Sequence, residues 1–377
     1  MKTARWTGEF VDSYFSALQS HLDFWIKTFL IPEGYMFGSV FVGGGTPSLF
    51  AKEYENIFCL LEPFLAEGAE ITLEANPDNM SEENLRFWKT LRFNRISCGV
   101  QSFSSAGLEA LTRKHKASEV PLAYERARKY FDSINLDLIY GWNGQTLGDW
   151  EKELSQLKQL SPDHASLYLL TYAPGTPLGR AHERGKLEAS SDQTLESFYE
   201  MARSSLADGG YDHEEVSNWS KGGKNCRHNW LYWQDQYYLA VGAGACGYLP
   251  SRKTPFGLRY QYTGREKKFC NQKLPEEWMS WDGRSEQLGD HFLIEERSPS
   301  IWLLEYIGAG LRSSRGVDLE LIRKKAAYVY KSSSFLEEAV KENCLRQEGS
   351  RLLLSEREWF RESSWCLKVF DAFSKEL

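Results

Sequence analysis

The sequence has little that would tie it to a membrane or a nucleic acid. No apolar run approaches the ~18 residues that a membrane span needs, and the first residues, 1–6, lack the apolar core of a signal peptide. A net charge of −7 and a pI near 5.7 argue against a broadly basic surface. We therefore expect a cytoplasmic protein with no transmembrane segment and no nucleic-acid partner.

The sequence also lacks paired cysteines. Its 7 cysteines are widely scattered, and no two of them form a Cys-x-x-Cys pair. An odd, dispersed set is typical of reduced thiols, whereas a disulfide framework or a thiolate metal site needs pairs at defined spacings.

Aromatic residues, in contrast, are abundant. The chain has 13 Trp, 19 Tyr and 21 Phe among 377 residues, a length that allows one large domain and a smaller one. Such residues fill a large core, and they also suit a flat, conjugated ligand. Composition leaves both interpretations open.

An apolar run ends in a glycine loop near the start of the chain. Residues 35–42 predict a buried strand, and Gly43–Gly45, Thr46 and Pro47 follow it at once. Glycines without Cβ atoms can adopt positive φ and allow a ligand to approach the backbone N–H groups. Taken alone, the cluster is weak evidence, because most glycine clusters after strands are simple turns.

Strands and helices alternate over the following 170 or so residues, which predicts βαβ units and a parallel sheet. The expected strands are 35–42, 69–77, 95–103, 133–141, 164–172 and 213–219, and the expected helices include 7–29, 52–64, 104–112, 118–131 and 192–208.

Two architectures fit this order: an open doubly wound sheet and a complete or partial (β/α) barrel. Polar residues favour the barrel, because the loop at Gly43–Thr46 and the side chains of Glu74, Gln101 and Asp137 lie near the carboxyl ends of successive strands. Each could instead be a helix cap or a turn former, but four in register are harder to explain in that way. The predicted fold class is thus α/β, a partial TIM-like barrel.

The repeat stops near Ser220, and we expect three regions: a barrel over 1–220, an aromatic and basic connector over 221–290, and a mainly helical, winged-helix-like domain over 291–377. In the last region helices are predicted at 301–311, 319–329 and 335–342, a short strand at 351–354, and a final helix after Ser355.

With these pieces in order, the chain resembles the radical S-adenosylmethionine (SAM) proteins of the oxygen-independent coproporphyrinogen oxidase superfamily, and within it the HemW heme chaperone branch. The motifs that carry the resemblance keep the family's order and spacing; they are Phe41–Pro47, Glu74–Pro77, Gly99–Phe103, Asn135–Gly141, Leu167–Thr171 and His228–Trp233.

The resemblance implies a SAM site on this chain. Gly44, Gly45 and Thr46 match the loop that holds the methionyl amino group, and the family's further SAM contacts fall on Glu74, Gln101, Arg113 and Asp137. Carboxylates for the amine and the ribose hydroxyls, and a guanidinium for the carboxylate, suit this ligand. Without the resemblance, Arg113 fits a solvated helix end equally well.

The run His228–Trp233 resembles the heme-associated His-Asn-x-x-Tyr-Trp motif of the chaperone branch. It implies His228 as a heme ligand, since a neutral imidazole can bind heme iron and aromatic rings can stack on the macrocycle. Arg252, Lys253, Arg259 and Arg265 could meet propionates, although a solvated basic loop is the simpler explanation. The expected function is heme binding and delivery to acceptor proteins in porphyrin metabolism.

Two alternatives stay open: a radical SAM coproporphyrinogen III oxidase, and a non-catalytic binding relic. Family members carry a Cys-x-x-x-Cys-x-x-Cys loop that binds a [4Fe–4S] cluster, and this sequence has none. Either the natural start lies upstream of Met1 or the chain is a degenerate member, so the cluster is expected only with an upstream cysteine loop, and enzymatic activity stays undecided.

One motif points elsewhere. Residues 242–247 satisfy Gly-x-Gly-x-x-Gly, but Pro250 stands where a helix should begin, so we do not expect a dinucleotide there.

Overall fold

The computed structural model describes residues 8–31, 34–251, 253–262, 292–331 and 333–375. Contacts divide the chain into two compact units. Unit 1 comprises Ser39–Ala51 and Glu70–His228, and unit 2 comprises Lys2–Gly38, Lys52–Ala69 and Asn229–Leu377.

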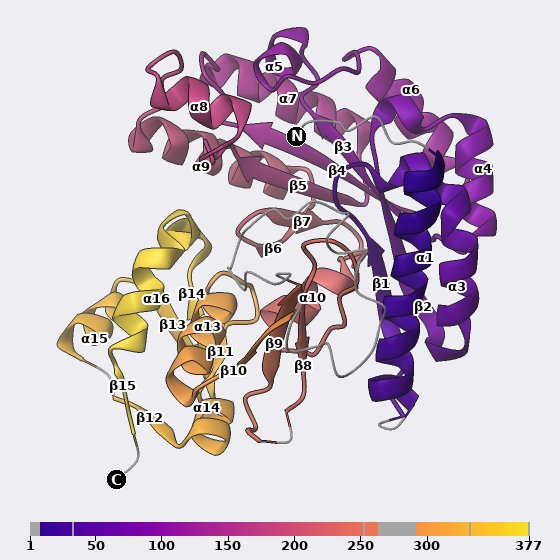
Figure 1. The fold of residues 1–377 in the computed structure, drawn as a ribbon. Coiled ribbons are helices and arrows are strands. Elements are labelled where there is room, and N and C mark those ends of the chain that lie inside the picture. The colour runs from indigo at the N-terminus through magenta and orange to yellow at the C-terminus, as the bar shows by residue number, and fades with distance from the viewer. Residues whose placement is uncertain (1–7, 32–33, 252, 263–291, 332, 376–377) are drawn as a thin grey trace. The chain divides into compact units, whose positions relative to one another are not determined.

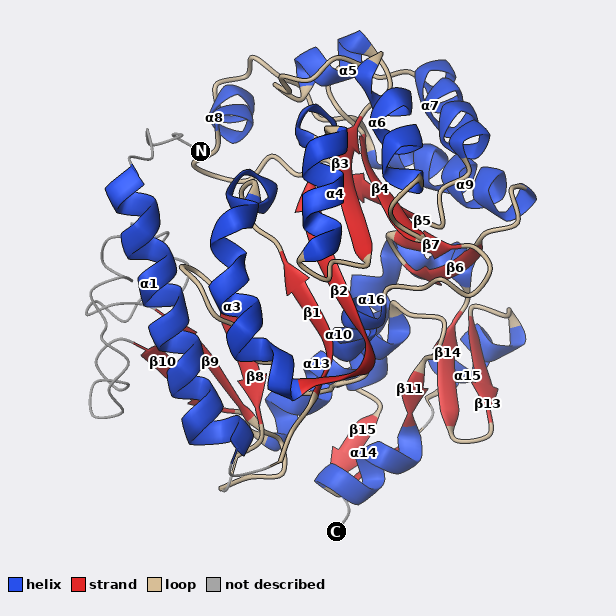
Figure 2. Ribbon diagram, turned by 90° about the vertical axis from the view of Figure 1, so that its right-hand side faces the viewer, coloured by secondary structure: helices blue, strands red, loops and turns tan. Residues whose placement is uncertain are grey.

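Unit 1 is built on a curled sheet in the order β1-β2-β3-β4-β5-β7-β6. Neighbouring strands from β2 to β5 pair in parallel, and Figure 2 shows them as a row of arrows. The strands are β1 (Phe37–Val42), β2 (Leu65–Ala75), β3 (Arg95–Gln101), β4 (Ser133–Tyr140), β5 (His164–Leu169), β6 (Asp212–Glu215) and β7 (Asn218–Ser220). The expected partial barrel is confirmed.

The two faces of this sheet differ sharply in polarity. Side chains alternate between faces along a strand, and one set is apolar and buried: Ile71, Leu73, Ile96, Cys98, Val100, Ile134, Leu136, Leu138, Ala165 and Leu167. The helices cover this outer face (Figure 1). The opposite, inner face carries polar side chains on every parallel strand from β2 to β5: Glu70, Thr72, Glu74, Arg95, Ser97, Gln101, Asn135, Asp137, His164, Ser166 and Tyr168.

Five helices of unit 1 begin at side chains that cap them. Ser81, Ser104, Thr146, Thr176 and Ser191 each accept a hydrogen bond from a first-turn N–H. The helices are α4 (Glu82–Thr90), α5 (Ser105–Ala110), α6 (Glu119–Arg128), α7 (Leu147–Leu160), α8 (Pro177–Glu183) and α9 (Asp192–Asp208), with 3-10 turns at Pro47–Glu53 and Pro77–Asn79.

The prediction of one continuous strand at 213–219 is wrong. The segment is a hairpin of β6 and β7, and β7 pairs antiparallel to β5. The chain after α9 therefore runs along the outer edge as β6 and turns back to place β7 beside β5. Strand ends also shift: β3 stops at Gln101 and β5 at Leu169.

Unit 2 begins with a long helix that packs on a small sheet. Helix α1 (Gly8–Trp25) continues as a π-helical turn (Ile26–Leu30), and the sheet has the order β10-β9-β8. The core between them joins Ala17, Phe24 and Trp25 to Leu249 and Tyr260. The further elements here are α3 (Tyr54–Leu61), the 3-10 turn Glu62–Phe64, α10 (Arg227–Trp233), which begins in unit 1, β8 (Cys246–Leu249), β9 (Leu258–Tyr262) and β10 (Phe292–Glu296).

Two features of this region bear on what the sequence predicts. Part of the expected connector is strand β9, and the glycines at 242–247 lead into strand β8, where a dinucleotide fingerprint would lead into a helix. Residues 263–291, with Arg265 and Cys270, and residue Arg252 lie outside the described residues.

The C-terminal part is helical with short antiparallel strands, as a winged-helix-like domain would be. The expected helix 319–329 is shorter, because it ends at Ala326 and Tyr328–Tyr330 forms a strand with Phe373–Lys375. The elements are α13 (Pro299–Leu311), β11 (Val317–Asp318), α14 (Leu319–Ala326), β12 (Tyr328–Tyr330), α15 (Ser334–Lys341), β13 (Leu345–Glu348), β14 (Arg351–Leu354), a 3-10 turn (Glu356–Arg361), α16 (Glu362–Phe370) and β15 (Phe373–Lys375).

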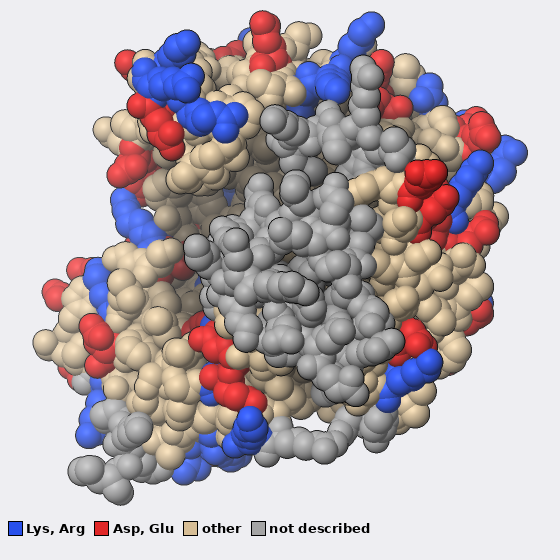
Figure 3. Space-filling model, viewed as in Figure 1, with Lys and Arg blue, Asp and Glu red and all other residues tan. Residues whose placement is uncertain are grey.

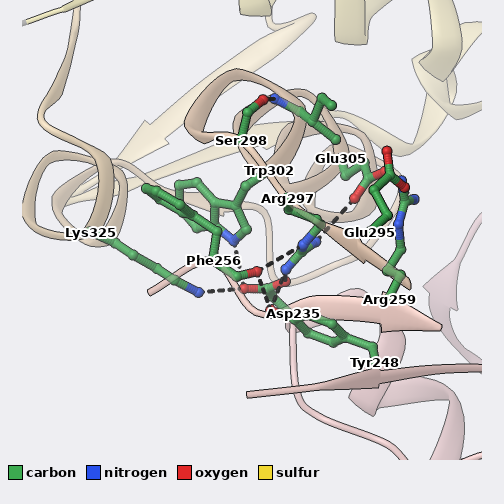
Figure 4. A network of polar contacts seen from close by, with 11 residues as sticks. Asp235, Tyr248, Phe256, Arg259, Glu295, Arg297, Ser298, Trp302, Glu305 and Lys325 are labelled. Carbon is green, nitrogen blue, oxygen red and sulfur yellow. Dashed lines mark hydrogen bonds and ion pairs between the residues drawn. The ribbon is translucent and has the colours of Figure 1, made fainter. Parts of the chain in front are cut away.

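A buried ionic network stabilises unit 2 (Figure 4). Arg297 Nη2 donates to Asp235 Oδ1 at 2.7 Å, and Lys325 Nζ donates to Asp235 Oδ2 at 2.8 Å. Trp302 Nε1 donates to the same Oδ2 at 2.7 Å, and Arg297 also bonds Glu305. Each charge is paired, which is the condition under which ions are buried without a large net cost.

The surface carries mixed charge. Basic and acidic side chains alternate over the described part of the face in Figure 3, so neither sign forms a broad field there. Of the helices in the described ranges, none combines the length and apolar character needed to cross a bilayer.

Candidate functional site

The glycine loop after β1 is held against a carboxylate of β2. Gly44 adopts φ +128°, and its N–H donates to Glu74 Oε2 at 2.9 Å. A Cβ on Gly43 would lie 3.0 Å from Glu74 Cδ, so the loop and the carboxyl group are in direct contact. Gly43, Gly44 and Gly45 are exposed, which leaves their other backbone groups accessible to a ligand.

Thr46 closes this loop. Its Oγ1 donates to the carbonyl of Gly45 at 2.7 Å, and its own carbonyl accepts from Leu49 at the start of the following 3-10 turn. The threonine therefore shapes the loop in this structure, with its side chain partly buried.

Asp137 lies on the inner face of β4 within a polar layer. Its carboxylate accepts hydrogen bonds from Asn135 Nδ2 at 2.7 Å and from Ser97 Oγ at 3.2 Å. Burial raises the pKa of Asp137, while the hydrogen bonds from Asn135 and Ser97 and the charge of Arg95 act to lower it. The layer thus holds the carboxylate in a fixed orientation.

Electrostatics connects three of the predicted residues. Burial raises the pKa of Glu74, and the neighbouring charge of Asp137 raises it further, against the hydrogen bond from Gly44. Partial burial lowers the pKa of Arg113, and the Asp137 carboxylate opposes that shift. Glu74, Asp137 and Arg113 are therefore near enough to one another for their charges to interact.

Arg113 is placed by the end of α5. Thr112 adopts φ +55°, and the N–H of Arg113 then donates back to the carbonyl of Leu108 at 2.8 Å. This αL ending is typical of helix C-termini. The arginine is both a helix-end residue and a neighbour of Asp137, so the two interpretations of the sequence are compatible.

Gln101 ends β3 in a backbone conformation that is rare for its type, with φ +66° and a register shift between Cys98 and Gln101. Its Nε2 would be 2.8 Å from a Cβ on Gly99, and Asn76 Oδ1 would be 3.0 Å away. Non-glycine residues at positive φ cluster at functional sites. Gly99 is needed here because a side chain would displace Gln101.

Tyr168 on β5 joins this group, although it was not among the predicted site residues. Desolvation by its neighbours raises the pKa of its hydroxyl, and the charges of Asp137, Glu215 and Glu74 act in the same direction, so it lies near these carboxylates. The signal was present in the sequence: in His164–Leu169 polar and apolar residues alternate, which places Tyr168 on the same face as Ser166.

His228 is fixed by residues far away in the sequence. The backbone N–H groups of Arg227 and His228, which open α10, both donate to the Glu70 carboxylate at 3.1 Å. An acidic group at a helix N-terminus satisfies free N–H groups and interacts favourably with the helix dipole. Glu70 was not a predicted site residue, because nothing local links it to His228.

The imidazole of His228 is held in its neutral form. Its Nδ1 lies 2.9 Å from Ser39 Oγ, and its ring stacks on Phe41 at 5.2 Å between centroids. Burial lowers the pKa of His228 to about 4, against the opposing charge of Glu70. A neutral imidazole is the form that can bind a metal.

The aromatic residues that follow His228 lie in unit 2. Arg315 stacks over Trp230 and Arg312 over Trp233, with 4.2 and 4.3 Å from guanidinium carbon to ring centroid. Tyr232 packs edge-on against Tyr238. Of the basic residues expected to meet propionates, Arg259 is bound to Glu295 and Glu305.

A radical SAM protein would also hold a [4Fe–4S] cluster, and the described residues do not fit one. Among them, no three His, Cys, Asp or Glu side chains gather as a metal site. Cys98 faces the outer, helix-covered side of β3, and Cys226 is buried against Glu70. The inner-face carboxylates and the glycine loop fit a SAM molecule, whereas the described thiols do not fit its cluster.

Known proteins resemble this chain in sequence and in fold. The radical SAM superfamily model matches residues 26–157. The heme chaperone HemW of Bacillus subtilis is 34% identical over 250 residues, which are 65% of this chain and 65% of that protein. The HemW of Synechocystis is 31% identical over 321 residues, 83% of this chain and 71% of the relative. The matched region spans just under two thirds of the Bacillus and Lactococcus lactis relatives, 65% and 66%.

A solved structure agrees in fold. The coproporphyrinogen III oxidase HemN of Escherichia coli, described as a radical SAM enzyme, superposes with a TM-score of 0.71 at 17% identity, over 96% of this chain and 83% of the other. The half-barrel with its glycine loop and inner carboxylates is thus of the radical SAM type. Within that superfamily, this chain belongs to the HemW family.

Proposed function

We propose that this protein binds heme through His228, binds SAM at the carboxyl edge of β1–β4, and passes heme to an acceptor protein. The observation that carries the heme part is the environment of His228. A neutral imidazole, oriented by Ser39 and Phe41 and anchored through Glu70, stands at the head of the motif that family members share.

The SAM part is supported by charge and access. SAM carries an ammonium, a sulfonium, a carboxylate and two ribose hydroxyls. Glu74 and Asp137 offer acceptors to the ammonium and the hydroxyls, Arg113 offers a guanidinium to the carboxylate, and the exposed loop at Gly44 and Gly45 allows close approach. These residues bind and orient, and no radical step is assigned to the chain.

A heme titration tests the proposal. Wild type, His228→Ala and His182→Ala are titrated with heme, and the Soret band is followed. His182 is the control because it stacks on Tyr172 and bonds the Leu187 carbonyl, away from His228. The proposal expects His228→Ala alone to lose the imidazole-ligated spectrum. Unchanged spectra would remove His228 as a ligand, and decarboxylated product from coproporphyrinogen III would favour an oxidase.

A further inference from the structure

Arg95 is a buried arginine without an ionic partner in the described part of the chain. It opens β3 on the inner face of the sheet, only 2% exposed. Within the described ranges its Nε has no hydrogen-bond partner and its guanidinium joins no ion pair. Buried arginines are almost always paired, since removing an unpaired charge from water costs on the order of several kcal/mol. Arg297, in contrast, is paired, because its guanidinium forms ion pairs with Asp235 and Glu305.

Two further polar groups on the same face of the sheet as Arg95 are also unsatisfied by any described residue. Thr72 is its direct partner in the β2–β3 register, fully buried, and its Oγ1 makes no hydrogen bond there. His164 on β5 is fully buried as well, and its Nε2 makes no hydrogen bond to a described atom and lies 3.9 Å from Glu214 Oε1. Buried polar atoms in native proteins are normally hydrogen-bonded to protein, water or ligand. These three atoms on one face therefore indicate a binding position.

The charge of Arg95 is felt across this face. It lowers the pKa of Asp137, and it adds to the burial that lowers the pKa of both His164 and His228. Arg95 thus lies within electrostatic reach of the SAM-side carboxylate and of the heme-side histidine. A group bound to Arg95 would therefore lie within electrostatic reach of both.

The surroundings select the ligand. A guanidinium binds a carboxylate through two parallel hydrogen bonds, and a threonine hydroxyl can donate a third. Glu70, Asp137 and Glu74 on the same face disfavour a second negative charge, because like charges in a poorly solvated site repel strongly. A monocarboxylate fits better than a phosphate.

We propose that Arg95 and Thr72 form a buried subsite for one carboxylate of the bound tetrapyrrole, a propionate. This inference rests on the proposed function, since it takes heme as the ligand. It assigns to the inner face the recognition of the propionate, while His228 meets the iron.

The test compares heme with its dimethyl ester, in which both propionates are neutral but the iron is unchanged. Wild type should bind heme about 10-fold or more tightly than the ester, the ratio expected for a charged hydrogen-bonded pair. Arg95→Met should lose that preference while keeping its affinity for the ester. Arg95→Lys should retain part of the preference, and Thr72→Val should lose about 3-fold of it.

A matched control is Arg86→Met, whose side chain is 70% exposed on α4 and which should behave as wild type. The subsite would be overturned if wild type bound heme and the ester with equal affinity. It would also be overturned if Arg95→Met lost affinity for heme and for the ester to the same extent. If Arg95→Met does not fold, the test depends on the Arg95→Lys variant and on the ratio of the wild-type affinities for heme and for the ester.

A second readout separates this inference from the proposed function. Sodium propionate should raise the Tm of wild type and not that of Arg95→Met or Arg95→Lys to the same extent, with sodium phosphate and chloride at equal ionic strength as controls. A propionate effect without any heme binding would overturn heme as the ligand and support a carboxylate subsite. Heme binding without a propionate effect and without an ester difference would overturn the subsite alone.

Discussion

The backbone N–H of Gly44 donates to the carboxylate of Glu74 at 2.9 Å, and this bond joins the loop after β1 to the polar face of β2. The bond requires Gly44 to hold φ +128°, a region that L-residues rarely adopt. One backbone conformation therefore sets both the shape of the loop and the position of the carboxylate that we assign to SAM.

A side chain at Gly44 should disturb that conformation. Gly44→Ala should lower the free energy of unfolding by about 1–3 kcal/mol and weaken SAM binding by about 10-fold or more, because relief of the strain moves the N–H away from Glu74. Isothermal titration with SAM and urea unfolding measure the two effects.

Gly68→Ala is the matched control for this strain. Gly68 also has positive φ, +66°, and no described atom lies within 4 Å of the place that a Cβ would occupy, so the variant should lose about 1 kcal/mol of stability and keep its SAM affinity. Equal loss of SAM binding in both variants would show that general destabilisation, and not the loop, is responsible.

The second prediction is that the charge of Glu74 lowers the stability of the folded chain and strengthens SAM binding. Burial raises the pKa of Glu74 in the folded chain, so stability falls as the pH rises from the ordinary carboxyl pKa through the folded one. Glu74→Gln keeps an oxygen for Gly44 but carries no charge. Its Tm at pH 7 should exceed that of wild type, with the difference shrinking toward about pH 4, while SAM affinity falls by about 10-fold or more.

Glu320→Gln provides the opposite case. Side-chain hydrogen bonds from Arg323 lower the pKa of the exposed Glu320 to about 2, so removing its charge should not raise the Tm. If Glu74→Gln lowers the Tm at pH 7, the carboxylate is not penalised by burial as we infer.

The third prediction follows from the low pKa of His228, about 4, which burial causes. In the unfolded chain the histidine takes up a proton near pH 6.5. The contribution of the neutral His228 ring to the free energy of unfolding is therefore fully present above that pH and is lost as the pH falls from about 6.5 to about 4. His228→Gln should remove this part of the pH dependence. Two-dimensional NMR of the imidazole should give a midpoint near 4, and a midpoint near 6.5 would contradict the buried, neutral ring.

The repeat of strands and helices and the position of the glycine loop could be predicted because they depend on the local sequence pattern. The hairpin of β6 and β7 could not be predicted, since the pattern of a short strand does not tell parallel from antiparallel pairing. Glu70 lies 157 residues from Arg227, so only the folded chain shows that it caps α10. Arg95 at the start of a strand gives no sign in the sequence that it is buried.

The last prediction tests the ionic network of unit 2. Asp235 accepts from Arg297, Lys325 and Trp302, and its side chain is only 8% exposed. Asp235→Ala leaves the Arg297 guanidinium buried without its main partner, which should lower the free energy of unfolding by about 3–5 kcal/mol.

Urea unfolding followed by tryptophan fluorescence measures the loss, with Glu320→Ala as the control. Glu320 pairs with Arg323 and Lys324 on the surface of α14, and such exposed pairs contribute about 0–1 kcal/mol. A loss below about 1 kcal/mol in Asp235→Ala would mean that water reaches Arg297 and replaces the carboxylate. If the loss of stability is large, SAM binding to unit 1 serves as a separate measurement on the same variant. The hydrogen bonds described above for Gly44, Glu74 and Asp137 do not involve Asp235.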